Sequence, residues 1–134
     1  MPLVRIDAPA AADDALVALG EAVHGALIEA FAIPEDDRFQ VLHGAGGGKV
    51  VYDAGYLGVT RDEGVAFVQV FLRRGRTDEQ KRLFYRSLAQ RAMTAGFEAR
   101  NLVVVLTENG LGDWSFGEGV AQYLDDPPGG RSVR

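Results

Sequence analysis

The sequence predicts an α+β fold in which two β-α-β units form a mixed four-stranded sheet with two helices on one face. Strand, helix and strand patterns occur twice along the 134 residues, and the second set follows the first by roughly 60 residues. Crossovers between parallel strands are right-handed, which places both helices on the same face. The composition, 47% hydrophobic and 25% charged, suits one globular domain with a modest core.

The first unit begins with a short strand. Residues 3–7 have the alternation of a strand with one buried face. A helix of about five turns follows, with Asp13 or Asp14 as its cap. Its apolar face is formed by residues at three- and four-residue spacing: Leu16, Leu19, Val23, Leu27 and Phe31. Pro34 ends this helix, and residues 39–43 form the second strand.

The segment between the units starts with a glycine-rich run, residues 44–49. It is not a P-loop, because His43 stands where the first glycine is required and Val50 replaces the Ser or Thr. The run therefore predicts a turn. Residues 49–52 and 56–59 are predicted to be short extended pieces joined by another turn.

The second unit contains the strongest strand pattern. Residues 65–72 are nearly all apolar, which predicts a central strand covered on both faces. Thr77 and Gln80 have the spacing of a capping box, and the helix that they begin ends near Gly96. Residues 102–106 are predicted to form another buried strand.

We expect one domain over residues 1–124 and a flexible tail at 125–134. Residues 107–123 are predicted to be a loop with a terminal hairpin. One face of the predicted sheet has no helix to cover it. In so small a chain, a second subunit is the expected cover, so we predict an oligomer.

The charge and composition exclude several kinds of partner. The net charge of −5 argues against binding to nucleic acid or to an anionic membrane surface. No apolar run is long enough to span a bilayer and no secretion signal is visible, so a cytoplasmic location is expected. The chain has no cysteine, and its two histidines lack the spacing of a zinc site. We therefore expect neither a metal nor a cofactor.

The amino terminus is a candidate for chemistry. Loss of Met1 would make Pro2 a terminal secondary amine, which can act as an acid, a base or a nucleophile. Met-Pro is also a common beginning, so these two residues alone decide nothing. Asp36 and Asp37 lie near a turn and are either solvated or close to Pro2. A carboxylate beside the amine would favour its protonated form.

Three arginines lie between the central strand and the second helix. A guanidinium holds a carboxylate through two parallel hydrogen bonds, so these residues suit a small carboxylate substrate, as does Arg38 just before the second strand. The three are Arg73, Arg74 and Arg76. The alternative is a solvated turn whose arginines pair with Asp78 or Glu79.

An aromatic pair, Trp114 and Phe116, lies in the motif Asp113-Trp114-Ser115-Phe116-Gly117. The motif is not a nucleophile elbow, because Asp113 stands where glycine is needed. The two aromatic residues either fill the loop or form the walls of a dry pocket, in which charges interact more strongly.

Together these segments resemble the tautomerase superfamily, and most closely its malonate semialdehyde decarboxylase branch. The resemblance covers residues 1 to about 124. The segments that carry it are Met1-Pro2-Leu3, Ala30 to Gln40, Arg74 to Lys81 with Phe84-Tyr85, Glu108-Asn109, and Asp113 to Gly117. The last segment is quite specific to this branch.

The resemblance implies a set of site residues. Pro2 is the implied catalytic amine and Asp37 the carboxylate beside it. The implied substrate-binding residues are the clamp Arg74 and Arg76, the additional Arg73, and the walls Trp114 and Phe116. One difference concerns Gly75, which stands between the arginines where the decarboxylase has a proline.

The resemblance also implies a cofactor-independent homotrimer that acts on small oxo-acids. The activity that we expect is decarboxylation of a 3-oxo acid such as malonate semialdehyde, with hydration as a second reaction of the same site. One alternative is keto-enol tautomerisation of a 2-oxo acid such as phenylpyruvate. The other is a non-catalytic trimer that binds a partner.

Overall fold

The computed structural model describes residues 1–128. Its strands and helices are β1 (Leu3–Asp7), α1 (Asp13–Phe31), β2 (Phe39–His43), β3 (Ala66–Arg73), α2 (Asp78–Thr94), β4 (Leu102–Asn109) and α3 (Gln122–Asp125). No described helix is both long and apolar enough to cross a membrane.

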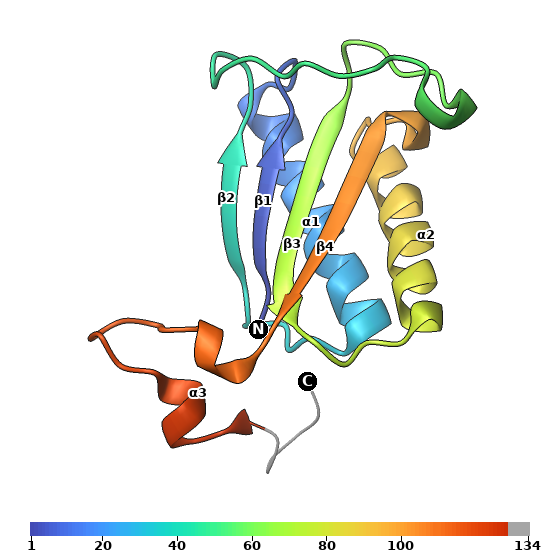
Figure 1. Cartoon of the computed structure of the whole chain (residues 1–134). Coiled ribbons are helices and arrows are strands. Elements are labelled where there is room, and N and C mark those ends of the chain that lie inside the picture. Colours follow the sequence, from blue (N-terminus) through green and yellow to red (C-terminus); the bar gives the residue numbers. More distant parts are fainter. Residues whose placement is uncertain (129–134) are drawn as a thin grey trace.

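The four strands form one mixed sheet in the order β2-β1-β3-β4 (Figure 1). β1 is parallel to β2, β3 is parallel to β4, and β1 and β3 are antiparallel. Both long helices lie on one face of this sheet, which confirms the predicted α+β fold. At one end of the sheet, the amino ends of β1 and β2 therefore meet the carboxyl ends of β3 and β4.

The core lies between the sheet and the two helices. Every second side chain of the inner strands is buried there: Val4, Ile6, Ala66, Val68, Val70 and Leu72. Phe31 at the end of α1 stacks on Phe84 of α2 with 5.3 Å between ring centroids. This contact ties the two helices together close to the end where the amino terminus lies.

The two helices begin differently. The predicted capping box of α2 is confirmed, because Thr77 Oγ1 accepts from the Gln80 amide at 3.1 Å and Gln80 Oε1 accepts from the Thr77 amide at 2.9 Å. The predicted cap of α1 is wrong. Ala12 is the capping residue and makes no side-chain hydrogen bond. Asp13 and Asp14 lie inside the first turn, where their negative charges interact favourably with the helix dipole.

The segment between β2 and β3 contains no strand, so the predicted extended pieces 49–52 and 56–59 are wrong. The ladder between β1 and β2 stops at His43, which leaves no neighbour for a further strand to pair with. Tyr56–Gly58 form a 3-10 turn instead, with Leu57 and Gly58 at positive φ.

Two predictions for the second half also need correction. β4 is an edge strand with Val105 about half exposed, and its pairing with β3 extends it from the predicted 102–106 to Asn109. The predicted terminal hairpin is absent from the described chain, where a 3-10 turn at Leu111–Asp113 and the short helix α3 take its place. Residues 129–134 of the predicted tail lie outside the described residues.

No helix of the described chain covers the other face of the sheet. Side chains on this face include exposed apolar residues from both edge strands, Phe39, Val41 and Val105. β3 alternates between fully and partly buried residues, so the prediction that it is covered on both faces holds for one face only. The predicted need for a covering subunit therefore stands.

Candidate active site

The amino terminus and Asp37 meet at one end of the sheet. In the parallel pairing of β1 and β2, Leu3 is opposite Phe39. Met1 and Asp37 each lie two residues before these partners, so the pairing brings them side by side. The Met1 ammonium nitrogen is 3.3 Å from Asp37 Oδ2, and both side chains are more than nine-tenths buried. Pro2 is buried beside them.

The turn before β2 directs Asp37 and Arg38 toward different neighbours. The Asp37 amide donates to the Pro34 carbonyl at 3.0 Å, which fixes this turn next to the amino terminus. Arg38 extends toward α1 instead, where its Nη1 donates to Glu21 at 2.8 Å. Asp37 is thus the carboxylate of this turn that reaches the amino terminus.

Arg73 and Arg74 lie where β3 meets the end of β4. Arg73 pairs in register with Asn109, and the Arg74 amide donates to the Asn109 carbonyl at 2.7 Å. A Cβ atom on Gly110 would meet Arg74 Nη1 at 2.8 Å. The glycine therefore leaves room for this guanidinium, which is otherwise exposed.

Arg76 points inward from the same turn. Its guanidinium carbon lies 5.5 Å from the centre of the Phe31 ring, and its Nη1 donates to the Arg73 carbonyl at 2.8 Å. Nη2 is buried and has no hydrogen-bond acceptor within residues 1–128. Burial, and next the charge of Arg73, lower the pKa of Arg76. A buried cation with an open donor favours a carboxylate ligand.

The structure thus brings the three arginines to one turn but gives their guanidinium groups different neighbours. Arg74 lies against Gly110, whereas Arg76 lies on Phe31. Of the two acids that this alternative requires, Glu79 instead forms an ion pair with Arg82 at 3.0 Å. The alternative of a turn neutralised by those two acids is therefore not favoured.

The segment after β4 brings aromatic side chains to the same end. Trp114 Nε1 donates to Asn109 Oδ1 at 2.8 Å, and the Trp114 ring stacks on Phe116. Phe116 also contacts Phe39 of β2 and Tyr123 of α3, with 6.3 and 4.9 Å between ring centroids. Figure 1 shows this segment passing below the sheet toward β2.

Sequence reasoning missed three of these residues as parts of the site: Phe39, Asn109 and Tyr123. Strand alternation could have placed Phe39 on the open face beside the amino terminus. The contacts of Phe116 with Phe39 and Tyr123 have no local signal, because they depend on the path of an irregular segment.

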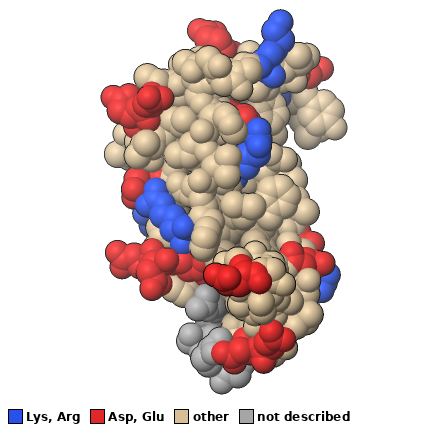
Figure 2. Space-filling model, turned by 90° about the vertical axis from the view of Figure 1, so that its left-hand side faces the viewer, with Lys and Arg blue, Asp and Glu red and all other residues tan. Residues whose placement is uncertain are grey.

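Charge around this end is local rather than spread over the surface. Figure 2 shows the flank beside β2, where acidic side chains gather at the lower end around the C-terminal segment. An anionic substrate is therefore not attracted by a broad basic surface. Its recognition depends on the few arginines of the β3–α2 turn.

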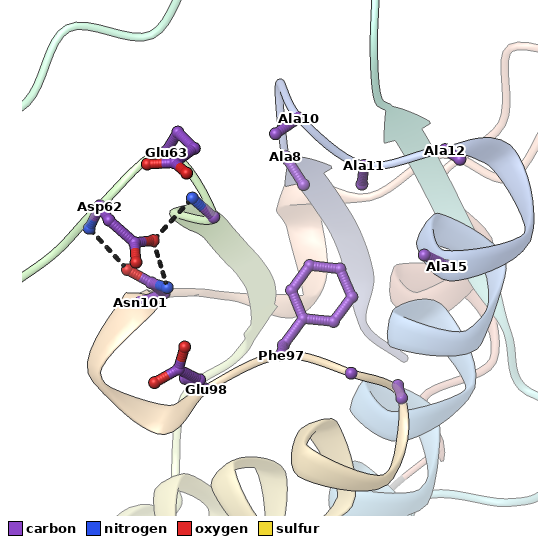
Figure 3. A pocket seen from close by; sticks show the side chains of 13 residues that line it. Ala8, Ala10, Ala11, Ala12, Ala15, Asp62, Glu63, Phe97, Glu98 and Asn101 are labelled. Atoms are coloured by element: carbon purple, nitrogen blue, oxygen red, sulfur yellow. Dashed lines mark hydrogen bonds between the residues drawn. The ribbon is translucent and has the colours of Figure 1, made fainter.

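A hollow of about 440 Å³ lies at the opposite end of the sheet (Figure 3). Alanines and Phe97 form one side, and Asp62, Glu63, Glu98 and Asn101 form the other. The Asp62 carboxylate accepts from the Gly64 amide at 2.8 Å and from Asn101 Nδ2 at 2.9 Å. Since these polar groups bind one another, the hollow is a weaker candidate site despite its size.

The histidines take no part in the candidate site. His24 is buried in α1 and its Nε2 donates to the Glu35 carbonyl at 2.8 Å, as expected for a structural residue. His43 lies 3.8 Å from the Asp7 carboxylate at the other end of β2. Among residues 1–128, no three histidine or acidic side chains gather in a way that could hold a metal ion.

Comparison with known proteins links this geometry to a family. Two family models, both described as tautomerase enzyme, match residues 2–45 and 37–117. Probable tautomerase YusQ of Bacillus subtilis (strain 168) is 35% identical over 127 residues, which are 93% of this chain and 100% of YusQ.

Solved structures extend the comparison. The FG41 malonate semialdehyde decarboxylase inhibited by 3-bromopropiolate is 35% identical, with a TM-score of 0.83 over 98% of this chain and 99% of that one. A more distant structure, a fused 4-OT described as a symmetric trimer, is 25% identical, with a TM-score of 0.67 over 88% and 94% of the two chains. The similarity thus spans the whole described fold.

Proposed function

This chain is an enzyme of the tautomerase superfamily, in its malonate semialdehyde decarboxylase-like branch, and from this premise we propose that it decarboxylates a small 3-oxo acid through Pro2. The observation that carries the proposal is the 3.3 Å contact between the amino terminus and Asp37. Once Met1 is removed, the terminal amine is that of Pro2, one residue after the nitrogen that contacts Asp37.

Asp37 sets the protonation of the amine. A terminal amine has an ordinary pKa of about 8. A neighbouring carboxylate favours the charged form, whereas burial and nearby arginines favour the neutral one. With Asp37 in contact and the arginines on a separate turn, the balance favours a protonated Pro2 that acts as an acid.

The substrate carboxylate is bound by the arginines. Nη2 of Arg76, buried and without an acceptor within residues 1–128, supplies one hydrogen bond, and Arg74 supplies further charge from the same turn. Trp114 and Phe116 exclude water from one side, which strengthens these interactions. The carboxylate is thereby held while the 3-oxo oxygen faces Pro2.

Decarboxylation then needs no cofactor. The bond between the carboxylate carbon and C2 breaks, carbon dioxide leaves, and the bonding electrons move toward the 3-oxo oxygen. The protonated amine stabilises the enolate by donating a hydrogen bond. The enolate finally takes a proton from solvent at C2 and leaves as the aldehyde. The same acid and clamp can promote addition of water to an acetylenic acid.

Tautomerisation of a 2-oxo acid is the second candidate. Three arginines close to the amine would lower its pKa, and a neutral Pro2 would act as a base that moves a proton between carbon and oxygen. The similarity to a probable tautomerase, YusQ, favours this alternative. The protonation state of Pro2 decides between the two reactions.

We propose a homotrimer as the working form. The uncovered sheet face carries Phe39, Val41 and Val105, each more than 40% exposed. The fused 4-OT relative is described as a symmetric trimer. A trimer that only binds a partner remains the third candidate, and it predicts either that Met1 is retained or that Pro2 is occluded by packing.

Parallel assays test the proposal. Protein shown by intact mass to lack Met1 should release carbon dioxide from malonate semialdehyde faster than it ketonises phenylenolpyruvate. Pro2→Ala should lower that rate by roughly 10²- to 10⁴-fold, because it replaces the catalytic secondary amine. Faster ketonisation would favour the tautomerase, and full activity in Pro2→Ala would exclude a catalytic Pro2.

A further inference from the structure

Glu108 connects three elements behind the arginine turn. It is opposite Leu72 in the pairing of β3 and β4, so its side chain lies on the helix side of the sheet. One carboxylate oxygen accepts from Lys81 Nζ of α2 at 3.1 Å. The other accepts from the Gly75 amide at 3.3 Å. Glu108 thus ties β4 and α2 to the residue between Arg74 and Arg76.

The turn needs such a connection. Gly75 has a φ of +124°, and a Cβ built on it would have no neighbour within 4 Å. Glycine has more backbone conformations open to it than any other residue, and this one has no side chain to anchor it. Without an additional bond, the directions of the flanking Arg74 and Arg76 are poorly fixed.

Glu108 also offsets the repulsion among the positive side chains of this turn. Arg73, Arg74, Arg76 and Lys81 carry like charges within one turn and the start of α2. The charge of Arg73 lowers the pKa of Arg76, whereas the charge of Glu108 raises that pKa. The carboxylate therefore offsets part of the repulsion that would separate the guanidinium groups.

We propose that Glu108 is a positioning residue for the arginine clamp: with Lys81 holding its carboxylate, it fixes the Gly75 backbone so that Arg74 and Arg76 bind one substrate carboxylate. This inference rests on the proposed function. Glu108 does not touch the substrate and acts through the turn alone. The hydrogen bond from Lys81, and after it the amides of Gly75 and Arg76, lower the pKa of Glu108, which keeps the acceptor ionised.

The test separates carboxylate binding from turnover. Malonate is the binding probe, because it offers a carboxylate but no oxo group. Glu108→Ala should raise the Kd for malonate and the KM for the oxo-acid by roughly tenfold, the loss expected for one charge-assisted contact. The value of kcat should change much less, since Pro2 and Asp37 are untouched. Glu108→Gln keeps an acceptor oxygen, so its Kd and KM should lie between those of the wild type and Glu108→Ala.

Controls distinguish positioning from general stability. Glu79→Gln removes a carboxylate from the first turn of the same helix, where Glu79 pairs with Arg82, and should leave Kd, KM and kcat unchanged. The Gly75 amide should exchange faster with solvent in Glu108→Ala than in the wild type. Unchanged malonate affinity in Glu108→Ala would overturn the inference, as would no malonate binding by the wild type. Malonate binding without turnover of any oxo-acid would instead overturn only the proposed function.

Discussion

The Asp62 cluster and Arg76, at opposite ends of the sheet, differ in how their polar groups are paired. At the end with the hollow, Asp62 accepts hydrogen bonds from Gly64, Asn101 and Arg100, the last at 2.7 Å. At the end with the amino terminus, Arg76 is partly buried and its Nη2 has no acceptor within residues 1–128. Polar groups that satisfy one another stabilise the fold, whereas an open buried donor costs stability and suits a ligand.

Among the variants that compare these two ends, the largest effect is expected for Arg76→Leu. It should lower kcat/KM for the oxo-acid by about 10- to 100-fold, the loss of a charge-assisted hydrogen bond to the substrate. Stability to urea should stay equal or rise, because leucine replaces a partly buried cation next to Phe31. Arg82→Leu on the exposed side of α2 is the matched control and should leave activity unchanged. A large loss of stability in Arg76→Leu would show that its guanidinium is structural.

The next effect compares one substitution at both ends. Asn101→Ala should destabilise the fold by about 1–3 kcal/mol, because it removes a buried amide that makes two hydrogen bonds to Asp62. Its kcat/KM should not change. Asn109→Ala should instead lower kcat/KM and leave stability nearly unchanged. It removes the hydrogen bond that holds the Trp114 ring beside the arginines. Urea unfolding measures the stability of both variants, and steady-state assays measure their kcat/KM. If both substitutions lowered stability equally, the two ends would not differ as described.

The smallest effect is a dependence of stability on pH. The amide of Gly64 is the largest cause that lowers the pKa of Asp62, and the Arg100 side chain likewise lowers the pKa of Glu98. A carboxyl whose pKa is lower in the folded state contributes its full stabilisation above the ordinary value of about 4, and loses it as the pH falls through the lowered value. The Tm should therefore fall with acid below about pH 4.

Asp62→Asn is the variant that tests this origin. It retains an acceptor for the Gly64 amide but does not titrate, so its Tm should fall less steeply in acid than that of the wild type. Thermal melts over the acid range measure the difference. If Tm fell equally steeply with acid in both proteins, a group other than Asp62 would cause the acid sensitivity.

The features that follow from short stretches of sequence could be predicted, and those that depend on chain path could not. Period and capping identified both long helices and all four strands, because the apolar faces of these elements form the core. The contact of Met1 with Asp37 also follows from the pairing of β1 with β2, once that pairing is known. The resemblance to a family named both residues without showing why they meet.

Other features have no local signal. The contact of Phe116 with Phe39 depends on how residues 110–121 cross the end of the sheet, where no repeating pattern guides the chain. The inward direction of Arg76 depends on the neighbouring Phe31, which is far away in sequence. The wrongly predicted extended pieces after β2 had strand-like residues but lacked a strand to pair with.

The central claim is that the amino terminus is the reactive group of a site built for small carboxylates. 3-Bromopropiolate tests it most directly, because this inhibitor of the FG41 relative offers a carboxylate to the arginines and an electrophilic carbon to the amine. Peptide mass spectrometry after inactivation should show one covalent adduct, on Pro2, with malonate protecting against it. An adduct on another residue, or none at all, would contradict the claim.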